Sequence, residues 1–591
     1  MYMSDKNSEF LEKKKMKRKS ACCILSVLAL VFVAEWRADA CTNIIISSGA
    51  SKDGSCLVSY AADSHSLYGE LYFRPAADYA PGTMLKIYDW DTGRYLGEIA
   101  QAEHTFKTVG NMNEHQLIIT ETTYGGREEL LDRRGIIDYG SLIYITLQRA
   151  KTAREAIQII VDLANEYGYA SEGETFSIAD KNEAWVMDLI GKGMNIRNGV
   201  NVDKGIVWVA RRVPDGYICA HANQARITRF PLHDSGNCQY SPDVISFARA
   251  NGWFSGSDEE FSFRDAYNPL DFGGARGCEA RVWSAFNILC DGHFTYVDAF
   301  GNERGASADD YLNYAMGHDL SSEMPLFVKS SRKITVKDVA DAMRDHYEGT
   351  PMDMRVDAGA GGNACPYRWR PMSFKVDGVE YVNERAIATQ QTGFWFVAQA
   401  RPSLPDVVGA LVWFGVDDAA TSWLTPIYVC STEVPECFKV GNGDLLHYSA
   451  KSAFWINNRV SNSCYRMYNL MEPFVREKID AFENEQIGKA VPEMDKKLAE
   501  LVHSGKADKA VKQMTDFSVK TAQKQFKAWV KLEETLLVKF IDGNVKAQDA
   551  KGNFKHTKYH DGTPEDLTQP GYTERFKRAI VRDNGEVLRS R

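Results

Sequence analysis

Residues 41–46 read Cys41-Thr42-Asn43-Ile44-Ile45-Ile46, a short run without Gly or Pro. Its β-branched side chains predict a β-strand. The run follows Ala38-Asp39-Ala40, whose small residues at positions 38 and 40 suit a signal-peptidase cleavage site. We therefore expect Cys41 to be the first residue of the mature chain, where it would carry a thiol and a free α-amine together.

A basic and then apolar leader precedes this cleavage site. Five lysines and one arginine fall within residues 13–19, and residues 21–34 are almost wholly apolar. A run of about 14 apolar residues has the length of a signal-peptide core and is shorter than the ~20 residues of a membrane-spanning helix. We therefore expect residues 1–40 to be a signal peptide and the protein to be exported, to the periplasm or the extracellular space. An uncleaved anchor is the alternative.

Lipoprotein signals offer a second interpretation of the same boundary. They also end immediately before a cysteine, whose amine is then acylated. Such signals usually carry a larger aliphatic residue three positions before the cysteine, where this chain has Ala38. A non-catalytic, lipid-anchored surface protein is therefore the alternative, and it excludes a free amine at Cys41.

Composition limits the remaining possibilities. The chain has 591 residues, of which 44% are hydrophobic, so a large catalytic domain with an appendage is expected. A net charge of −9 argues against nucleic-acid binding. The twelve cysteines contain no C-x-x-C pair and no Cys/His cluster with zinc spacing, so we expect no metal and no organic cofactor. Cys430 and Cys437 could close a small disulfide loop.

The order of predicted elements indicates an α+β fold. Strand-like runs dominate the first part of the mature chain, helical stretches follow at 139–167, 280–289 and 336–347, and an antiparallel strand pair returns at 393–414. Without regular βαβ alternation, this order favours antiparallel sheets covered by helices. From 475 to 540 the chain is rich in Lys, Glu, Ala and Leu, which predicts two or three amphipathic helices.

We accordingly expect four segments along the chain. Residues 1–40 form the signal peptide, 41–475 the catalytic domain, 476–548 a helical C-terminal extension and 549–591 a polar tail. No second apolar segment has the length needed to span a membrane after the signal is removed. The C-terminal helices could provide a homo-oligomer interface.

A cysteine at the first position of a chain can supply both the nucleophile and the general base of a hydrolase. A thiol has a pKa of ~8.5 and an α-amine one of ~7.7–8.0, so the amine can take the thiol proton and later return it to the leaving group. Such an enzyme still needs an anion to hold the ammonium and donors for the oxyanion.

The sequence here resembles the PepD-type dipeptidases, cysteine members of the N-terminal nucleophile (Ntn) hydrolases. The resemblance begins at Cys41 and covers roughly residues 41–471. Its motifs are Cys41–Ile46, Asp53-Gly54-Ser55, Asn113–Leu117, Ile119–Thr123, Gly173–Asp180, Glu183–Val186, Trp208–Asp215, Ala222–Ile227, Cys278–Trp283, Trp413–Asp418 and Ser452–Trp455. It implies an αββα sandwich of two antiparallel sheets between helix layers. It also implies hydrolysis of dipeptides through a thioester acyl-enzyme, without a cofactor.

The resemblance assigns four residues. Cys41 matches the nucleophile, Asp63 the acid that binds the cysteine amine, and Asn223 an oxyanion-hole residue. Arg281 matches an arginine that supports the nucleophile region. The alternatives are an ordinary turn residue for Asp63, a loop-capping residue for Asn223 and a structural ion pair for Arg281.

The chain also departs from the family pattern. Many relatives carry Arg-Asn-x-Asp in the second strand, where this chain has Tyr60-Ala61-Ala62-Asp63. In those relatives the arginine would lower the pKa of the thiol. Because this chain lacks it, either another cation takes its place or this branch has altered activity. A different amide substrate, such as an acyl-amino acid or a bile salt, is therefore the alternative to a dipeptide.

Overall fold

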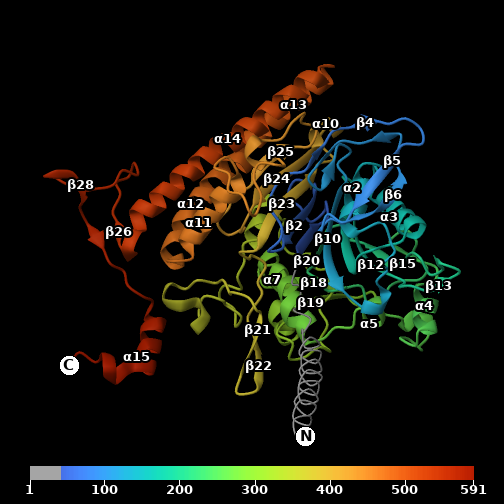
Figure 1. Ribbon diagram of the computed structural model, residues 1–591, viewed down its shortest axis with the longest axis horizontal. Coiled ribbons are helices and arrows are strands. Elements are labelled where there is room, and N and C mark those ends of the chain that lie inside the picture. The colour runs from blue at the N-terminus through green and yellow to red at the C-terminus, as the bar shows by residue number, and fades with distance from the viewer. Residues whose placement is uncertain (1–40) are drawn as a thin grey trace, which may run out of the picture. The chain divides into compact units, whose positions relative to one another are not determined.

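The computed structural model describes residues 41–591 (Figure 1), and the expected signal peptide lies outside the described residues. Two large sheets, both wholly antiparallel, carry most of the strands, and helices flank them. The α+β class expected from the sequence is therefore confirmed. Among the described residues, no helix combines the length and the apolar character needed to cross a membrane.

The first sheet has six strands and contains the strand that begins at the predicted mature terminus. Its spatial order is β16 (Ile218–His221), β1 (Thr42–Ile46), β2 (Cys56–Asp63), β23 (Thr392–Ala400), β24 (Ala410–Val416) and β25 (Thr425–Tyr428). Every residue of β1 and β2 is buried, as expected for a strand pair inside a layered core. The short strand β1 is thus paired on both edges and held rigidly.

The second sheet has eight strands. Its order is β17 (Cys238–Tyr240), β15 (Ile206–Arg212), β12 (Ala184–Gly191), β11 (Gly173–Ala179), β10 (Ile118–Gly125), β9 (Met112–Asn113), β8 (Thr108–Val109) and β3 (Phe73–Arg74). The hairpin between β11 and β12 turns where Asp180 accepts hydrogen bonds from the backbone N–H groups of Asn182 and Glu183. Residues 176–190 thus form a strand, a tight turn and a return strand.

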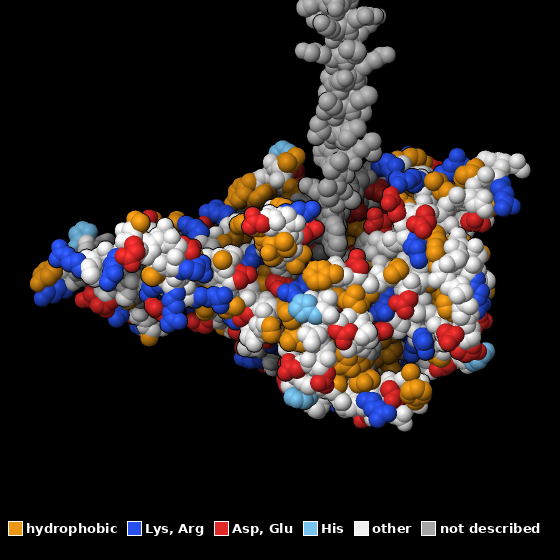
Figure 2. Space-filling view, turned by 90° about the horizontal axis from the view of Figure 1, so that it is seen from below, with side chains coloured by type: hydrophobic (Ala, Val, Ile, Leu, Met, Phe, Trp, Pro, Cys, Tyr) orange, Lys and Arg blue, Asp and Glu red, His pale blue; other side chains and the backbone are white. Residues whose placement is uncertain are grey.

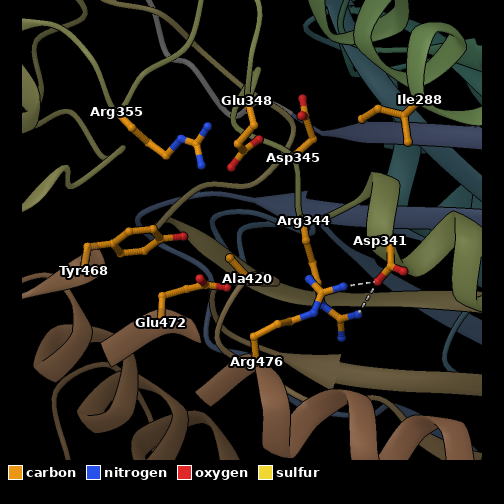
Figure 3. A pocket seen from close by; sticks show the side chains of 10 residues that line it. All are labelled: Ile288, Asp341, Arg344, Asp345, Glu348, Arg355, Ala420, Tyr468, Glu472 and Arg476. Carbon is orange, nitrogen blue, oxygen red and sulfur yellow. Dashed lines mark hydrogen bonds and ion pairs between the residues drawn. The ribbon is translucent and has the colours of Figure 1, made fainter. Parts of the chain in front are cut away.

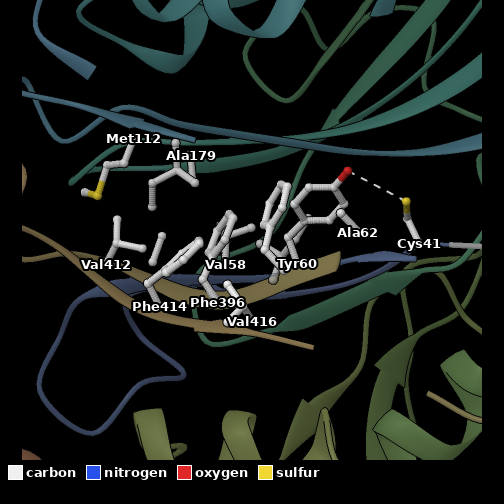
Figure 4. Packing of buried hydrophobic residues seen from close by; sticks show 14 of the residues in the cluster. Cys41, Val58, Tyr60, Ala62, Met112, Ala179, Phe396, Val412, Phe414 and Val416 are labelled. Atoms are coloured by element: carbon white, nitrogen blue, oxygen red, sulfur yellow. Dashed lines mark hydrogen bonds between the residues drawn. The ribbon is translucent and has the colours of Figure 1, made fainter. Parts of the chain in front are cut away.

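The side chains of the two sheets share one apolar core. In Figure 4, Val58 and Phe396 of the six-stranded sheet lie in the same cluster as Met112 and Ala179 of the eight-stranded sheet. Because strand side chains alternate between faces, the neighbouring residue Leu57 belongs to a different cluster. The two sheets therefore pack face to face.

Helices cover the opposite face of each sheet. A second cluster joins Ile44 and Trp395 to α7 (Ala280–Leu289) and α9 (Val336–Ala342). A third joins strands of the eight-stranded sheet to two further helices, α2 (Tyr139–Leu147) and α3 (Ala153–Tyr167). The predicted helical stretch 139–167 is two helices, because Thr152 caps a new helix by accepting a hydrogen bond from the Glu155 N–H.

The C-terminal region is helical up to residue 540. Its helices are α11 (Ala453–Cys464), α12 (Tyr468–Glu485), α13 (Val491–His503) and α14 (Ala507–Phe540). In Figure 1, α14 runs beside β25. Its buried residues Ala522, Trp529 and Leu536 recur at helical spacing, and Trp529 packs against Trp423 with ring centroids 4.8 Å apart.

Shorter elements complete the described chain. They are the hairpins β5 (Met84–Tyr88) with β6 (Tyr95–Ala100) and β21 (Ser373–Val376) with β22 (Val379–Val382), the set β18 (His293–Val297), β19 (Glu303–Ser307) and β20 (Lys329–Ser330), and the last helix, α15 (Glu574–Leu588). On the face in Figure 2, acidic and basic side chains are interspersed.

All ten described cysteines are free thiols, so Cys430 and Cys437 form no disulfide here. The division of the chain into domains stays a prediction.

A buried ion pair fastens α12 to the rest of the protein. Glu483 accepts hydrogen bonds from Arg344 at 2.5 and 3.0 Å, and the two side chains are 0% and 1% exposed. Arg344 in turn lies 4.9 Å from the centroid of the Trp395 ring. A charge buried this deeply is tolerated only while its partner is present.

We predict that Glu483→Gln lowers the free energy of unfolding by about 3 kcal/mol, because it removes the buried partner of Arg344 and leaves only the longer contact with Asp341 at 3.4 Å. Urea denaturation followed by circular dichroism measures this change. Glu485→Gln on the same helix is the control, since Glu485 is exposed and its loss should cost less than about 0.5 kcal/mol. Equal destabilisation by the two variants would contradict the prediction.

Candidate functional site

Cys41 lies directly before β1, at the end of the six-stranded sheet. Thr42 pairs with Ala61 in the antiparallel register, which brings Cys41 beside the last residues of β2. The side chain is 8% exposed and belongs to the core between the sheets. In Figure 4 its sulfur points toward the hydroxyl of Tyr60.

Two polar side chains contact the thiol. Cys41 Sγ lies 3.5 Å from Glu121 Oε1 and 3.7 Å from the Tyr60 hydroxyl, and that hydroxyl donates a short hydrogen bond to the same carboxylate oxygen. Glu121 is part of β10, so it reaches the thiol from the other sheet. Sequence reasoning missed Glu121, although it lies inside the matched motif 119–123. The one available signal was an acidic residue in an otherwise apolar and β-branched strand.

The environment of the thiol keeps it protonated. Burial raises the pKa of Cys41 well above its usual value, and the negative charges of Glu121 and Asp63 raise it further. The hydrogen bond with Tyr60 opposes this rise. A neutral thiol is a poor nucleophile, so attack on a carbonyl here requires a group that takes its proton.

Glu121 forms a buried pair with a second carboxyl group. Glu174 is fully buried, and Thr123 donates a hydrogen bond of 2.8 Å to its Oε1. Burial and the neighbouring charge of Glu121 raise the pKa of Glu174 well above its usual value. Burial also raises the pKa of Glu121, but hydrogen bonds from Tyr60, Glu174 and Cys41 oppose the rise. The pKa of Glu174 is thus raised more than that of Glu121, because Glu121 has more donors to its carboxylate.

Asp63 is the last residue of β2 and is 1% exposed. Arg385 forms an ion pair with its Oδ2 at 2.6 Å, and Thr392 donates a hydrogen bond of 2.6 Å to its Oδ1. Burial raises the pKa of Asp63, whereas the Arg385 charge lowers it. The backbone of Asp63 also makes a hydrogen bond with the Cys41 thiol, which lowers the pKa of the thiol. Arg385 was not expected from the sequence, which separates it from Asp63 by 322 positions.

Arg281, on α7, holds the backbone of the nucleophile. Its Nη1 donates to the carbonyl oxygen of Cys41 at 2.6 Å and to Thr42 Oγ1 at 2.8 Å. Its Nη2 donates to the carbonyl of Ala222 at 3.1 Å and to Asn223 Oδ1 at 2.9 Å. Within residues 41–591, Arg281 makes no ion pair, so the alternative of a structural ion pair does not describe it. Arg281 fixes the position of Cys41 relative to Asn223.

Asn223 follows β16 in a left-handed backbone conformation, with φ of 60°. Its side-chain Nδ2 donates a hydrogen bond of 2.6 Å to the carbonyl oxygen of Thr123, on β10. Its Oδ1 accepts from Arg281. The amide group is thus oriented by β10 of the eight-stranded sheet and by α7. The structure brings all four residues expected from the sequence, Cys41, Asp63, Asn223 and Arg281, into one region around the end of β1.

Tyr60 occupies the position of the missing family arginine. In the described part of the chain, the side chains hydrogen-bonded to the thiol are Tyr60 and Glu121, and neither carries a positive charge. The nearby cations Arg281 and Arg385 bind backbone oxygens and Asp63 instead. No cationic side chain therefore replaces the arginine in direct contact with the thiol. Residues 41–591 also contain no group of three His, Cys, Asp or Glu side chains arranged to hold a metal ion.

Known proteins resemble most of this chain. A protein named probable dipeptidase from Salmonella dublin is 24% identical over 423 residues, which cover 66% of this chain and 81% of that protein. Dipeptidase A of Lactobacillus helveticus is 22% identical over 500 residues, covering 80% and 91%. A dipeptidase of Bifidobacterium longum is 23% identical over 464 residues, covering 72% and 77%.

A family model matches a similar part of the chain. The sequence model of peptidase family C69 matches residues 40–481. This range begins at the predicted cleavage boundary and ends within α12. The resemblance to the dipeptidases drawn from the motifs is thus confirmed, and the chain belongs to peptidase family C69.

Proposed function

We propose that this protein is an exported cysteine dipeptidase in which Cys41 is both the nucleophile and, through its α-amine, the general base. The observation that carries the proposal is the position of Cys41. It lies at the predicted cleavage boundary, and one arginine, Arg281, ties its carbonyl to the side chain of Asn223. Membership in a peptidase family and relatives named dipeptidase support dipeptides as the substrate.

The proposed reaction begins when the signal peptide is removed and the α-amine of Cys41 becomes free. The amine takes the thiol proton, and the thiolate attacks the scissile carbonyl to form a C–S bond. The ammonium then protonates the leaving amine as the C–N bond breaks, which leaves a thioester on Cys41. Water hydrolyses the thioester by the same proton transfers and restores the thiol.

Two further residues have proposed roles in these steps. The charge of Asp63, which raises the pKa of the neighbouring thiol, would equally stabilise the ammonium form of the Cys41 amine. The Asn223 amide would donate a hydrogen bond to the oxyanion. Arg281 contacts the backbone of Cys41, so it is a positioning residue.

The layers of the structure support the proposal that the fold is an Ntn-hydrolase sandwich. Two antiparallel sheets share a core, and helices lie on the outer face of each. In the proposed sandwich, β1 presents its first residue at the edge of this core. Export is proposed on the basis of the leader sequence, with a lipid anchor as the alternative.

The charge beside the thiol favours a dipeptide over an acylated amide. Glu121 lies 3.5 Å from Cys41 Sγ, and we propose that it is the charged member of its pair with Glu174. A dipeptide presents a free α-ammonium one bond from the carbon that bears the scissile carbonyl, whereas acyl-amino acids and bile salts present no cation there. We therefore propose that Glu121 attracts the substrate ammonium.

We predict that Cys41→Ala abolishes dipeptide hydrolysis while the protein keeps its fold, since the thiol forms the acyl-enzyme. A mature chain that carries one extra residue before Cys41 should be inactive as well, because its amine is acylated. Release of amino acids from a dipeptide measures activity, and circular dichroism checks folding. Full activity of the extended chain would disprove the amine-base mechanism.

The mature terminus itself can be determined directly. We expect mass spectrometry of the exported protein to find an unmodified Cys41 as its first residue. A diacylglyceryl group on Cys41 would instead establish the lipoprotein alternative.

We predict that Glu121→Gln raises KM for dipeptides by about tenfold, roughly the 1.4 kcal/mol expected from one lost ionic contact. The same change removes a charge that raises the thiol pKa, so the acidic limb of kcat/KM should move to lower pH. Steady-state kinetics across pH measures both effects.

Glu174→Gln is the matched control, because the proposal places the proton of the carboxyl pair on Glu174, whose pKa burial and Glu121 raise. This variant should leave both KM and the acidic limb nearly unchanged. Equal effects of the two substitutions would show that the charge of Glu121 is not responsible.

A further inference from the structure

A polar cavity of 190 Å³ lies between the chain that follows α9 and the helix α12 (Figure 3). Its volume is far above the roughly 10–15 Å³ that one water molecule requires, so a small organic molecule can enter. The side chains that matter for its chemistry are Asp345, Glu348, Arg355, Tyr468, Glu472 and Arg476. None of them belongs to the site around Cys41.

Most of the charges at this cavity already have partners. Arg344 is paired with Glu483. Arg476 bonds Asp341 and forms an ion pair with Asp480 at 2.9 Å. These residues therefore build the wall of the cavity and leave no net charge of their own for a ligand.

Two groups on α12 have no such partner. Tyr468 is only 5% exposed, yet no hydrogen bond of its hydroxyl is found within residues 41–591, and Figure 3 shows the hydroxyl pointing into the cavity. The Glu472 carboxylate likewise makes no hydrogen bond or ion pair with the described chain. Both groups face the cavity, so a ligand there can accept a hydrogen bond from the Tyr468 hydroxyl or donate one to it and can donate to the Glu472 carboxylate.

A cation stands across the cavity from these two groups. Arg355 donates its Nε and Nη2 to Asp353 at 3.0 and 2.8 Å, and Figure 3 shows its guanidinium extending from the other wall. Glu348 lies beside it and accepts a hydrogen bond of 2.6 Å from the backbone N–H of His346. Carboxylates thus lie at both ends of the cavity, and Arg355 Nη1 is the guanidinium nitrogen that Asp353 leaves available for a ligand.

We propose that this cavity binds a free α-amino acid, with its ammonium group on Glu472 and the Tyr468 hydroxyl and its carboxylate on Arg355. A ligand with both charges fits this arrangement better than a simple cation, because its carboxylate can accept from Arg355 Nη1, which a simple cation leaves unused. It also fits better than a simple anion, which would leave the Glu472 carboxylate without a partner.

A residue in the wall of the cavity connects it to the nucleophile region. Tyr347, between the lining residues Asp345 and Glu348, donates a hydrogen bond of 2.6 Å from its hydroxyl to the carbonyl of Arg385. Arg385 is the ion-pair partner of Asp63. Dipeptide hydrolysis releases α-amino acids, so a product bound here could affect Asp63 through Tyr347 and Arg385. This consequence, unlike the binding site, rests on the proposed function.

Calorimetric titration of the mature protein with L-alanine tests the site. The titration uses the Cys41→Ala background, so no turnover is needed and a failure of the proposed function does not affect the result. We expect one binding site whose affinity falls at least about tenfold in Glu472→Gln and in Tyr468→Phe, the loss expected for one hydrogen bond to a charged group. Methylamine and acetate, which each carry one half of the ligand, should bind more weakly than alanine.

Glu477→Gln is the matched control, since Glu477 lies on α12 but outside the cavity, and it should bind alanine normally. Arg355→Gln provides a second test at a half-exposed position, and it should weaken alanine while leaving methylamine unchanged. Thermal melting checks that each variant is folded. Absence of alanine binding, binding that Glu472→Gln leaves unchanged, or equally tight binding of methylamine would each overturn the proposal.

Discussion

The guanidinium of Arg281 is the contact on which the geometry of the nucleophile region depends. It is 1% exposed, and its charge is met by carbonyl and side-chain oxygens rather than by a carboxylate. A buried charge of this kind is stable only when all its acceptors are in place. Its acceptors come from Cys41, Thr42 and the chain after β16, so the arginine is satisfied only when α7 and two neighbouring strands have assembled.

The charges around Cys41 explain why this thiol is inert until it acquires a base. The negative charge of Glu121 and the burial of the site both favour the protonated thiol. Arg385, the nearest cation on the side of Asp63, is paired with that carboxylate and does not hydrogen-bond the sulfur. In the proposed mechanism, removal of the signal peptide supplies the one group that the site lacks. The leader would therefore also prevent premature hydrolysis.

The C-terminal helices contribute more than a cover for the six-stranded sheet. Glu483 of α12 neutralises Arg344, which packs on Trp395 of β23. The same helix carries Tyr468 and Glu472, whose unpaired polar groups define the proposed amino-acid site. Helix α12 thus stabilises the fold and also lines the proposed second binding site.

Local patterns in the sequence predicted the elements of this fold because their periods report which side of an element is buried. The β-branched run in Cys41–Ile46 and the helical spacing in 507–540 are such patterns, and the structure confirms both elements. The four site residues were found from motifs, and the structure places them together, although their catalytic roles stay predictions.

Only the tertiary structure decided which side chains surround the four site residues. Glu121 lies 80 positions from Cys41 in the sequence, and Arg385 lies 322 positions from Asp63. Contacts over such separations depend on how two sheets pack and on which loop crosses a strand end. A single sequence does not encode either in a local pattern. The strand and the candidate nucleophile were therefore predictable from the sequence itself, which is also the basis for the predicted leader, whereas the charges around the nucleophile were set by packing.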